Sequence, residues 1–264
     1  MSFYGSSFSF NGVSCEEYGL MLYDFGSTSQ GDSKFVSPEI YEDRVPNRTR
    51  SLFYGTNYSN PLEFTLVFGA NEYAANQYEP LDRYDLAAIS SWLLNDTYQW
   101  LVIDQPDMHE FRYRCIITDL ETIEVAMEHW AYKCTVHCDS PYAYTLPMNY
   151  VYEVNDTLDI NLHSYSTVNR VYYPKLSIDI NGANVIEIIN ESINDEPFKL
   201  DFNGSSISSV VIDGETGVIT GTNDNMYQYF NFHFPALVRG DNHLRIKGSG
   251  TYTFTCEFPM NIGG

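Results

Sequence analysis

The residue types best able to do chemistry in this chain gather in HWAYKCTVHC, which contains His129, Cys134, His137 and Cys138. Imidazoles and thiolates are ligands that zinc prefers, and zinc sites usually space them in pairs across a turn. In a β-strand, however, successive side chains point to opposite faces, so Cys134 and Cys138 share one face while His137 lies on the other. We therefore expect these cysteines to belong to a hydrophobic core, and we expect no metal site.

Carboxylates that could act as general acid and base are abundant, and two pairs are close in sequence, Asp104 with Asp107 and Asp119 with Glu121. No recognisable motif accompanies them. The chain contains no G-x-S-x-G nucleophile, no phosphate-binding G-x-x-x-x-G-K-[ST] and no H-E-x-x-H. The sequence therefore predicts a protein that is not an enzyme and that holds no cofactor.

Basic side chains are few, and Arg44, Arg48 and Arg50 fall together in EDRVPNRTR. Arg112 and Arg114 are two residues apart in a predicted strand and share one of its faces. In so acidic a chain these arginines could pair with carboxylates of a neighbouring subunit. The alternative for the first three is a solvated loop. We treat all five as candidate contacts between subunits.

The net charge of −21 is spread along the chain, with 21 acidic and 8 basic residues up to Ser140 and 14 against 6 beyond it. Nucleic-acid binding depends on Lys and Arg, so sequence-specific DNA binding is not expected. No apolar run approaches the ~18 residues of a membrane span, and the first residues lack the pattern of a signal peptide. We expect a soluble protein made in a cytoplasm, with its five cysteines as free thiols.

Short segments of alternating apolar and polar residues, separated by Gly, Asn, Asp and Ser, predict a mainly β protein. One helix is expected from about Leu81 to Leu94, capped by Asp82, with Leu86, Ile89 and Leu93 on its buried face. Residues 26–61 are polar and rich in turn signals, which predicts a long arm or hairpin. An extension of that length usually contacts another molecule.

A domain boundary is expected near Pro141, which gives domains over residues 1–140 and 141–264. The second half reads as successive short strands and predicts an antiparallel β-sandwich that ends in a hairpin, with Gly248-Ser249-Gly250 as its turn. Aromatic side chains there could also stack on sugars, so a carbohydrate-binding module is the alternative function. The candidate rings are Tyr142, Tyr144, Tyr150, Tyr152, Tyr165, Tyr172, Tyr173, Tyr227 and Tyr229.

Six segments, taken in order, resemble the distal tail proteins (Dit) of bacteriophages with long, non-contractile tails. They are FSFNGVSCEEYGLMLYDF at the start, ISSWLLND followed by YQWLVIDQPDMHEFRYRCIITD, CTVHCDSPYAY at the predicted boundary, and VVIDGETGVITG with FPALVRGDNHLRIKGSGTYTFTCEF near the end. The likeness covers nearly the whole chain. The segments 26–61 and 184–198 do not align with the family pattern.

The resemblance implies two β-sandwich domains, the first with a helix and an extended hairpin and the second galectin-like or carbohydrate-module-like. It also implies a structural role: a ring, expected to be hexameric, at the distal end of the tail tube. Such a ring would join the tail tube protein to the tail-tip or baseplate hub protein, and to a receptor-binding protein, and would leave a channel for DNA. The implied location is the virion tail tip, after assembly in the cytoplasm of the bacterial host.

Overall fold

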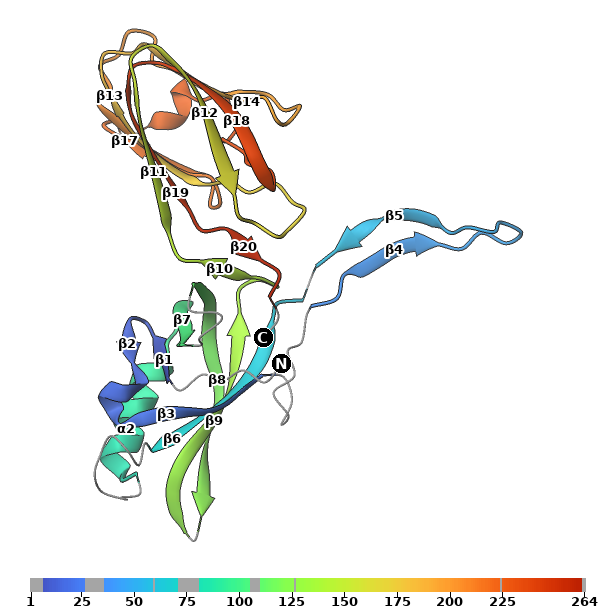
Figure 1. Ribbon diagram of the computed structural model, residues 1–264, viewed down its shortest axis with the longest axis vertical. Helices are drawn as coiled ribbons and strands as arrows, with labels where there is room; N and C mark the ends of the chain where they lie inside the picture. The colour runs from blue at the N-terminus through green and yellow to red at the C-terminus, as the bar shows by residue number, and fades with distance from the viewer. Residues whose placement is uncertain are drawn as a thin grey trace. The chain divides into compact units, whose positions relative to one another are not determined.

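The computed structural model describes residues 7–26, 36–58, 60–70, 81–104, 110–125, 127–223 and 225–262, with the backbone alone for residues 24–26 and 125. The chain forms two compact units, residues 1–144 with 261–264 and residues 145–260. The sequence placed the boundary between residues 140 and 141, whereas the units divide between Tyr144 and Thr145, and Ile262 packs against the core of unit 1. The predicted mainly β architecture is confirmed, and the described residues contain one α-helix (Figure 1).

Unit 1 is built on an antiparallel sheet with the strand order β2-β1-β7-β8-β9-β6-β3, and a short strand, β10, pairs with β8. Among the described strands, β4 and β5 pair with each other and with no other strand. The strands are β1 (Ser7–Phe10), β2 (Val13–Ser14), β3 (Leu20–Gly26), β4 (Glu39–Asp43), β5 (Leu52–Asn57), β6 (Glu63–Ala70), β7 (Gln99–Asp104), β8 (Phe111–Val125), β9 (Glu128–Cys138) and β10 (Ala143–Thr145).

The first hairpin follows directly from its sequence. Asn11 and Gly12 join β1 to β2 with φ of 53° and 77°, and this pair of left-handed residues makes the tight turn that matches strand twist. Phe8 and Phe10 point inward from β1 and are buried. A 3-10 helix, η1 (Cys15–Tyr18), follows β2, and the Ser14 hydroxyl accepts a hydrogen bond from the Glu16 N–H at its start.

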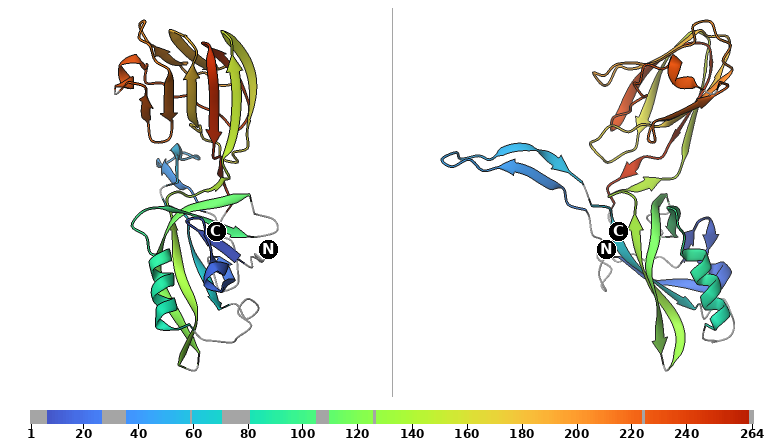
Figure 2. Two further views of the ribbon diagram at one scale, coloured as in Figure 1. Left: turned by 90° about the vertical axis from the view of Figure 1, so that its left-hand side faces the viewer. Right: turned by 180° about the vertical axis from the view of Figure 1, so that it is seen from behind.

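The helix α2 (Arg83–Leu93) is confirmed with its predicted cap. The Asp82 carboxylate accepts hydrogen bonds from the backbone N–H of Tyr84 and Asp85, and the Asp85 carboxylate accepts one from the Asp82 N–H. This reciprocal pair satisfies N–H groups that the first helical turn leaves free. The helix lies beside the sheet in both views of Figure 2 and buries Ile89, Trp92 and Leu93.

Trp92 ties α2 to β1. Its indole N–H donates a hydrogen bond of 3.0 Å to the backbone oxygen of Phe10. Its ring stacks on Phe8 on one side, at 5.7 Å, and on Tyr18 at 4.7 Å. The core of unit 1 is therefore aromatic and holds the helix by both packing and a buried hydrogen bond.

Unit 2 is a sandwich of two antiparallel sheets. The five-stranded sheet has the order β11-β19-β13-β16-β17 and the four-stranded sheet the order β12-β18-β14-β15. Their strands are β11 (Met148–Val154), β12 (Thr157–Ser164), β13 (Lys175–Ile180), β14 (Val185–Asn190), β15 (Phe198–Asp201), β16 (Ser209–Asp213), β17 (Val218–Gly221), β18 (Gly240–Lys247) and β19 (Gly250–Cys256). A 3-10 helix, η2 (Met226–Tyr229), and a last short strand, β20 (Pro259–Met260), complete the described elements.

The predicted terminal hairpin is wrong. β18 pairs with β12 and β14, whereas β19 pairs with β11 and β13, so the two strands lie in opposite sheets. Both edges of β18 are occupied by other strands, and the chain at Gly248 (φ 110°) crosses from one sheet to the other. The predicted alternation is nevertheless confirmed, because Leu244 of β18 and Phe254 of β19 are buried in the same core from its two sides.

A fully buried Asn242 holds the loop that leads into β18. Its side-chain oxygen accepts hydrogen bonds from the Val238 N–H and the Asn190 amide, at 2.8 and 2.9 Å. Its side-chain amide donates to the backbone oxygens of Val238 and Gly240. A buried amide whose donors and acceptors are all used fixes one loop conformation, since any other would leave polar groups unpaired.

Candidate functional site

The hairpin of β4 and β5 is a ribbon separate from the main sheet of unit 1, as Figure 1 and the right-hand view of Figure 2 show. Its base is attached on both sides. Val36 before β4 packs against the core of unit 1, and Leu62 after β5 is buried there and exchanges backbone hydrogen bonds with Ser140 and Cys138. The extension predicted over residues 26–61 is thus a hairpin within its described part, residues 36–58, 60 and 61, while residues 27–35 and 59 lie outside the description.

The hairpin exposes large apolar side chains. Phe53 and Tyr54 are 65% and 64% exposed, and Ile40 and Tyr41 are 61% and 50% exposed. Every residue of β4 is exposed, so no core made of described residues covers either face of the ribbon. The register shifts between Tyr41 and Glu42, which inserts a bulge. A two-stranded ribbon is marginally stable on its own, and apolar surface concentrated on it marks a contact site.

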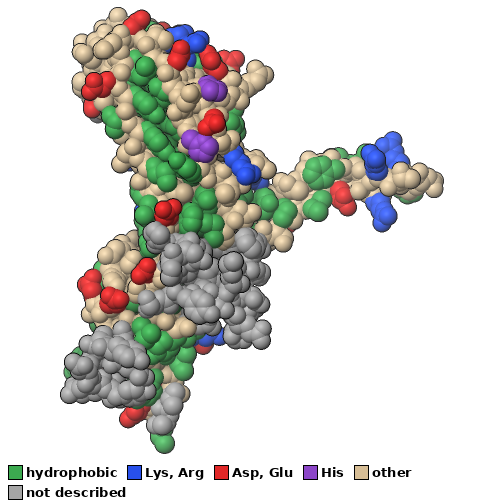
Figure 3. Space-filling model, in the orientation of Figure 1, with side chains coloured by type: hydrophobic (Ala, Val, Ile, Leu, Met, Phe, Trp, Pro, Cys, Tyr) green, Lys and Arg blue, Asp and Glu red, His purple; other side chains and the backbone are tan. Residues whose placement is uncertain are grey.

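The tip of the hairpin is basic. Arg44, Arg48 and Arg50 lie in the loop between β4 and β5 and all three are exposed, and basic side chains gather at that end in Figure 3. Asn47 at φ 68° and a hydrogen bond from the Arg48 N–H to the Val45 oxygen make the turn. Within the described part of the chain, none of the three guanidinium groups forms an ion pair or a hydrogen bond. The structure thus places these three predicted contact residues together at the tip of the hairpin, where their side chains are exposed.

Arg112 and Arg114 lie in β8 and are engaged within unit 1. The guanidinium of Arg112 lies 3.7 Å from the centre of the Trp100 ring, a cation–π contact. Arg114 forms an ion pair of 3.3 Å with Asp139. Burial raises the pKa of the Asp139 carboxyl, and Arg114 opposes that rise. The structure therefore does not bring these two arginines together with the other three in one surface.

The cysteines lie in the two cores, as strand alternation predicts. Cys134 and Cys138 are buried, while His137 on the opposite face of β9 lies 3.2 Å from the Glu63 carboxylate. His129 instead lies 3.5 Å from Glu124. Across the described residues, no group of three or more His, Cys, Asp or Glu side chains is arranged to hold a metal ion.

The carboxylate pairs that the sequence offered do not form a described site. Asp104 accepts a hydrogen bond of 3.4 Å from the Ser7 hydroxyl, and Asp107 lies outside the described residues. Asp119 adopts φ of 51° at a bulge in β8, between Thr118 and Glu121. Among the helices that the structure describes, none is long and apolar enough to cross a membrane.

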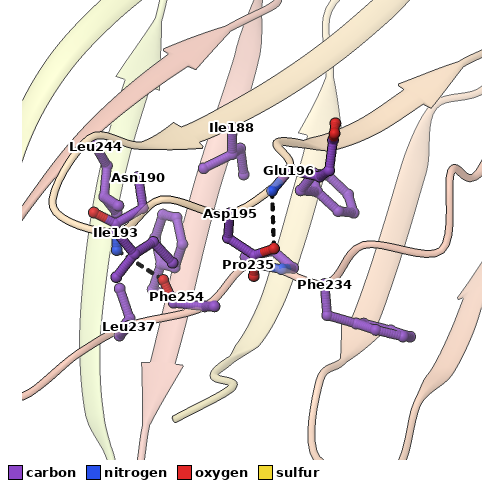
Figure 4. Close-up of a pocket in the computed structure, with 12 residues that line it drawn as sticks. Ile188, Asn190, Ile193, Asp195, Glu196, Phe234, Pro235, Leu237, Leu244 and Phe254 are labelled. Carbon is purple, nitrogen blue, oxygen red and sulfur yellow. Dashed lines mark hydrogen bonds between the residues drawn. The ribbon is translucent and has the colours of Figure 1, made fainter. Parts of the chain in front are cut away.

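Unit 2 contains a small crevice between the sandwich and the loop before β18 (Figure 4). Apolar side chains such as Ile188 and Phe234 line it. Two hydrogen bonds lie at its edge: the Asn190 side-chain amide donates to the Ala236 backbone oxygen, and the Glu196 N–H donates to the Asp195 carboxylate. The cavity measures about 10 Å³, which is room for about one water molecule. It is too small for an organic ligand.

A larger hollow, of about 230 Å³, lies over the outer face of the four-stranded sheet. It is lined by side chains of β12 and β18 and by Glu191 after β14. Sequence reasoning missed this polar surface because its residues come from strands more than 80 positions apart, such as Asp159 and Arg245. Of the tyrosines considered for sugar stacking, Tyr165, Tyr173 and Tyr227 are exposed.

Two protein-family models together match nearly the whole length of the chain. A family model described as the phage tail protein N-terminal domain matches residues 3–140, and one described as the phage tail C-terminal domain matches residues 142–256. No curated protein matches the chain.

A solved structure of similar fold is that of the Dit protein (gp 19.1) of SPP1, described as a paradigm of the hub adsorption apparatus in phages that infect Gram-positive bacteria. The match has a TM-score of 0.68 at 11% identity and covers 96% of this chain and 98% of that one. The resemblance to distal tail proteins inferred from the sequence is thereby confirmed at the level of family and fold. Because the N-terminal model alone matches more than half of the chain, the chain belongs to the family of phage tail proteins.

Proposed function

We propose that this phage tail protein is the hub at the distal end of the tail tube, where copies of it close into a hexameric ring. The observation that carries the proposal is the hairpin β4–β5, whose exposed aromatic side chains and basic tip have no partner surface among the described residues of the chain. The likeness of fold to the SPP1 hub protein supports the same assignment.

A closed ring needs two different patches on each subunit, one contacting the other on the next copy. The hairpin supplies one patch. Burying Phe53 and Tyr54 against a neighbour would remove from water two of the most exposed apolar side chains of the chain. The open edges of β4 and β5 could at the same time pair with strands of that neighbour.

Charge favours the same contact. The three arginines of the tip are part of a total of 14 Lys and Arg, in a chain of net charge −21. An acidic neighbour would attract this tip, speed the encounter and fix the register of the contact. Another copy of this acidic chain would supply such a neighbour.

The ring would surround a channel through which phage DNA passes. Six copies at −21 each carry a formal charge of −126. Acidic walls repel phosphate, so DNA would move past them without binding. The ring would contact the tail tube protein on one side, the tail-tip or baseplate hub protein on the other, and through the latter a receptor-binding protein.

Light scattering coupled to size-exclusion chromatography, followed by negative-stain imaging of the full chain, tests the proposal. The expected result is a closed hexameric ring in equilibrium with monomer. A chain that remains monomeric at high concentration, alone and mixed with its tail tube and tip proteins, would contradict it. A ring of another stoichiometry would contradict the hexamer while leaving the hub role intact.

A further inference from the structure

The outer face of the four-stranded sheet carries a row of polar cross-strand pairs. In the register of β12 with β18, Asp159 is opposite Arg245, Asn161 opposite His243, and His163 opposite Asp241. Each pair is in contact: Arg245 donates to Asp159 at 2.8 Å, the His163 imidazole lies 2.6 Å from Asp241, and Asn161 hydrogen-bonds to His243. Successive pairs are about 7 Å apart along the strands, so the row extends over roughly 13 Å.

The row is hollowed at one end. The cavity of about 230 Å³ lies over Asp159, Asn161, His243 and Arg245, with Glu191 at its rim. Arg245 bridges two carboxylates there, because a second ion pair of 2.9 Å joins it to Glu191. Its guanidinium is thus held in place, with the N–H groups not used by the carboxylates left for a ligand.

The hydrogen-bonding groups and the charges of the row indicate which class of ligand it could bind. Its side chains offer planar donors and acceptors, which can bind neighbouring hydroxyl groups in pairs. Three carboxylates, those of Asp159, Glu191 and Asp241, stand against the one guanidinium of Arg245 in and around the row, so the surface does not favour a polyanion. Acidic, basic and histidine side chains gather over β12 and β18 in Figure 3.

An aromatic ring stands at the other end of the row. Tyr165 follows His163 on the same side of the chain, is 52% exposed, and has its ring centre 4.9 Å from that of His163. A half-exposed ring beside hydrogen-bonding groups can pack against the apolar face of a sugar ring. Cross-strand pairing alone would account for the ion pairs, but it requires neither the hollow nor the exposed ring.

We propose that this row, from Arg245 to Tyr165, is a binding site for a neutral, hydroxyl-rich oligosaccharide, such as a stretch of a bacterial surface polysaccharide. The hollow would take one sugar unit and the rest of the row the next. The site lies within unit 2 and does not depend on ring formation, so it stands or falls separately from the proposed hub.

An NMR titration of the full chain tests the proposal. The probes are soluble neutral tetrasaccharides of glucose, galactose and N-acetylglucosamine, and an oligomer of glycerol phosphate as the polyanion. At least one neutral probe is expected to bind with a Kd on the order of 1 mM or tighter, and to shift the amide signals of β12 and β18. The Asn161→Ala and Arg245→Met variants should weaken binding about 10-fold or more, while Lys175→Ala, on the other sheet, should not.

Each of the other outcomes overturns the assignment. If no neutral probe shifts those signals at about 5 mM, the row is a paired surface and not a saccharide site. Tighter binding of the glycerol phosphate oligomer would mean that the ligand is anionic. Binding that survives in both variants, after thermal unfolding has shown that they fold, would place the site elsewhere.

Discussion

Two pairs of antiparallel strands expose their side chains in this protein, and they do so in opposite ways. The hairpin β4–β5 exposes Phe53, Tyr54 and Ile40, and no core in the described part of the chain covers it. The outer face of β12 and β18 exposes polar side chains that pair across the strands, while Leu244 and Ile246 on the inner face are buried in the sandwich. In an isolated chain the hairpin leaves apolar surface in contact with water, whereas the polar side chains of the sheet face already have hydrogen-bond or ion-pair partners.

The difference shows what kind of partner each surface can have. Apolar surface gains free energy when it is covered, so the hairpin favours a large and permanent contact with protein. Paired polar groups gain little from a partner that merely replaces their existing hydrogen bonds, so the sheet face suits a small, weak and specific ligand. The predictions below separate these two behaviours.

The largest effect is expected from removal of the hairpin. Residues 39–57 are deleted and Pro38 is joined to Tyr58 through two glycines, which can span the gap because Glu39 and Asn57 are strand partners. Val36 and Leu62 remain to anchor the chain, so unit 1 should fold and its circular dichroism should keep the β signal. Ring formation should be abolished in light scattering, and a shortened chain that still forms rings would show that the hairpin is not the interface.

The second test changes two side chains of the hairpin. The Phe53→Asp/Tyr54→Asp variant should weaken assembly about 100-fold or more, because two apolar anchors become charges at the contact. Its matched control is Tyr84→Asp, since Tyr84 of α2 is 85% exposed and lies outside the hairpin. Sedimentation measures both, and equal loss of assembly in the two variants would indicate a nonspecific effect of charge.

The third test concerns the core beneath the polar row. Asn242→Ala should lower the free energy of unfolding of unit 2 by about 1–3 kcal/mol, because buried backbone groups of Val238 and Gly240 lose their partners. All three tryptophans, Trp92, Trp100 and Trp130, lie in unit 1. Urea unfolding followed by tryptophan fluorescence should therefore keep its midpoint while the circular dichroism transition moves, and a common shift would mean that the units unfold together.

A smaller effect is expected at the basic tip. Replacing Arg44, Arg48 and Arg50 by Gln should slow assembly about 10-fold at low ionic strength, since the tip steers the encounter with an acidic copy. The difference should vanish at about 1 M salt, where the Debye length falls to about 3 Å. Stopped-flow light scattering follows this, with Lys175→Gln and Lys199→Gln in unit 2 as the charge control. A defect that persists in high salt would point to packing instead of steering.

The smallest effect is expected on the sheet face. Arg245→Met breaks two exposed ion pairs but leaves the inner face of β18 unchanged. Exposed pairs contribute little, so the midpoint of thermal unfolding should stay within about 2 °C of the parent value. A larger drop would mean that the row stabilises the sandwich, and would weaken the case for a binding role.

Local signals in the sequence were sufficient for some features. The helix α2 could be predicted because Asp82, Asp85 and the spacing of Ile89 and Leu93 all act within one segment. The hairpin was suggested by the polar, turn-rich composition of residues 26–61 together with its arginines. The exposed rings on it were not singled out, because alternation within one strand does not say which face is covered.

Pairings between distant segments could not be predicted in the same way. The sequence suggested a hairpin of β18 with β19, since consecutive strands often pair. The structure places β12 and β14 beside β18 instead, and it is this pairing that brings Asp159 to Arg245 and His163 to Asp241. The polar row therefore depends on a register that links residues about 80 positions apart, and no motif within one segment records it.

The buried cysteines have a consequence for the ageing of the phage particle. All five are buried, and burial raises the pKa of Cys134 and Cys256 to about 12 and also raises the pKa of Cys15, Cys115 and Cys138. Oxidants and disulfides attack the thiolate, which is scarce at such pKa values and out of reach in a closed core. The thiols of this tail protein should therefore resist oxidation by air, so disulfide cross-links between tail proteins should not accumulate during storage.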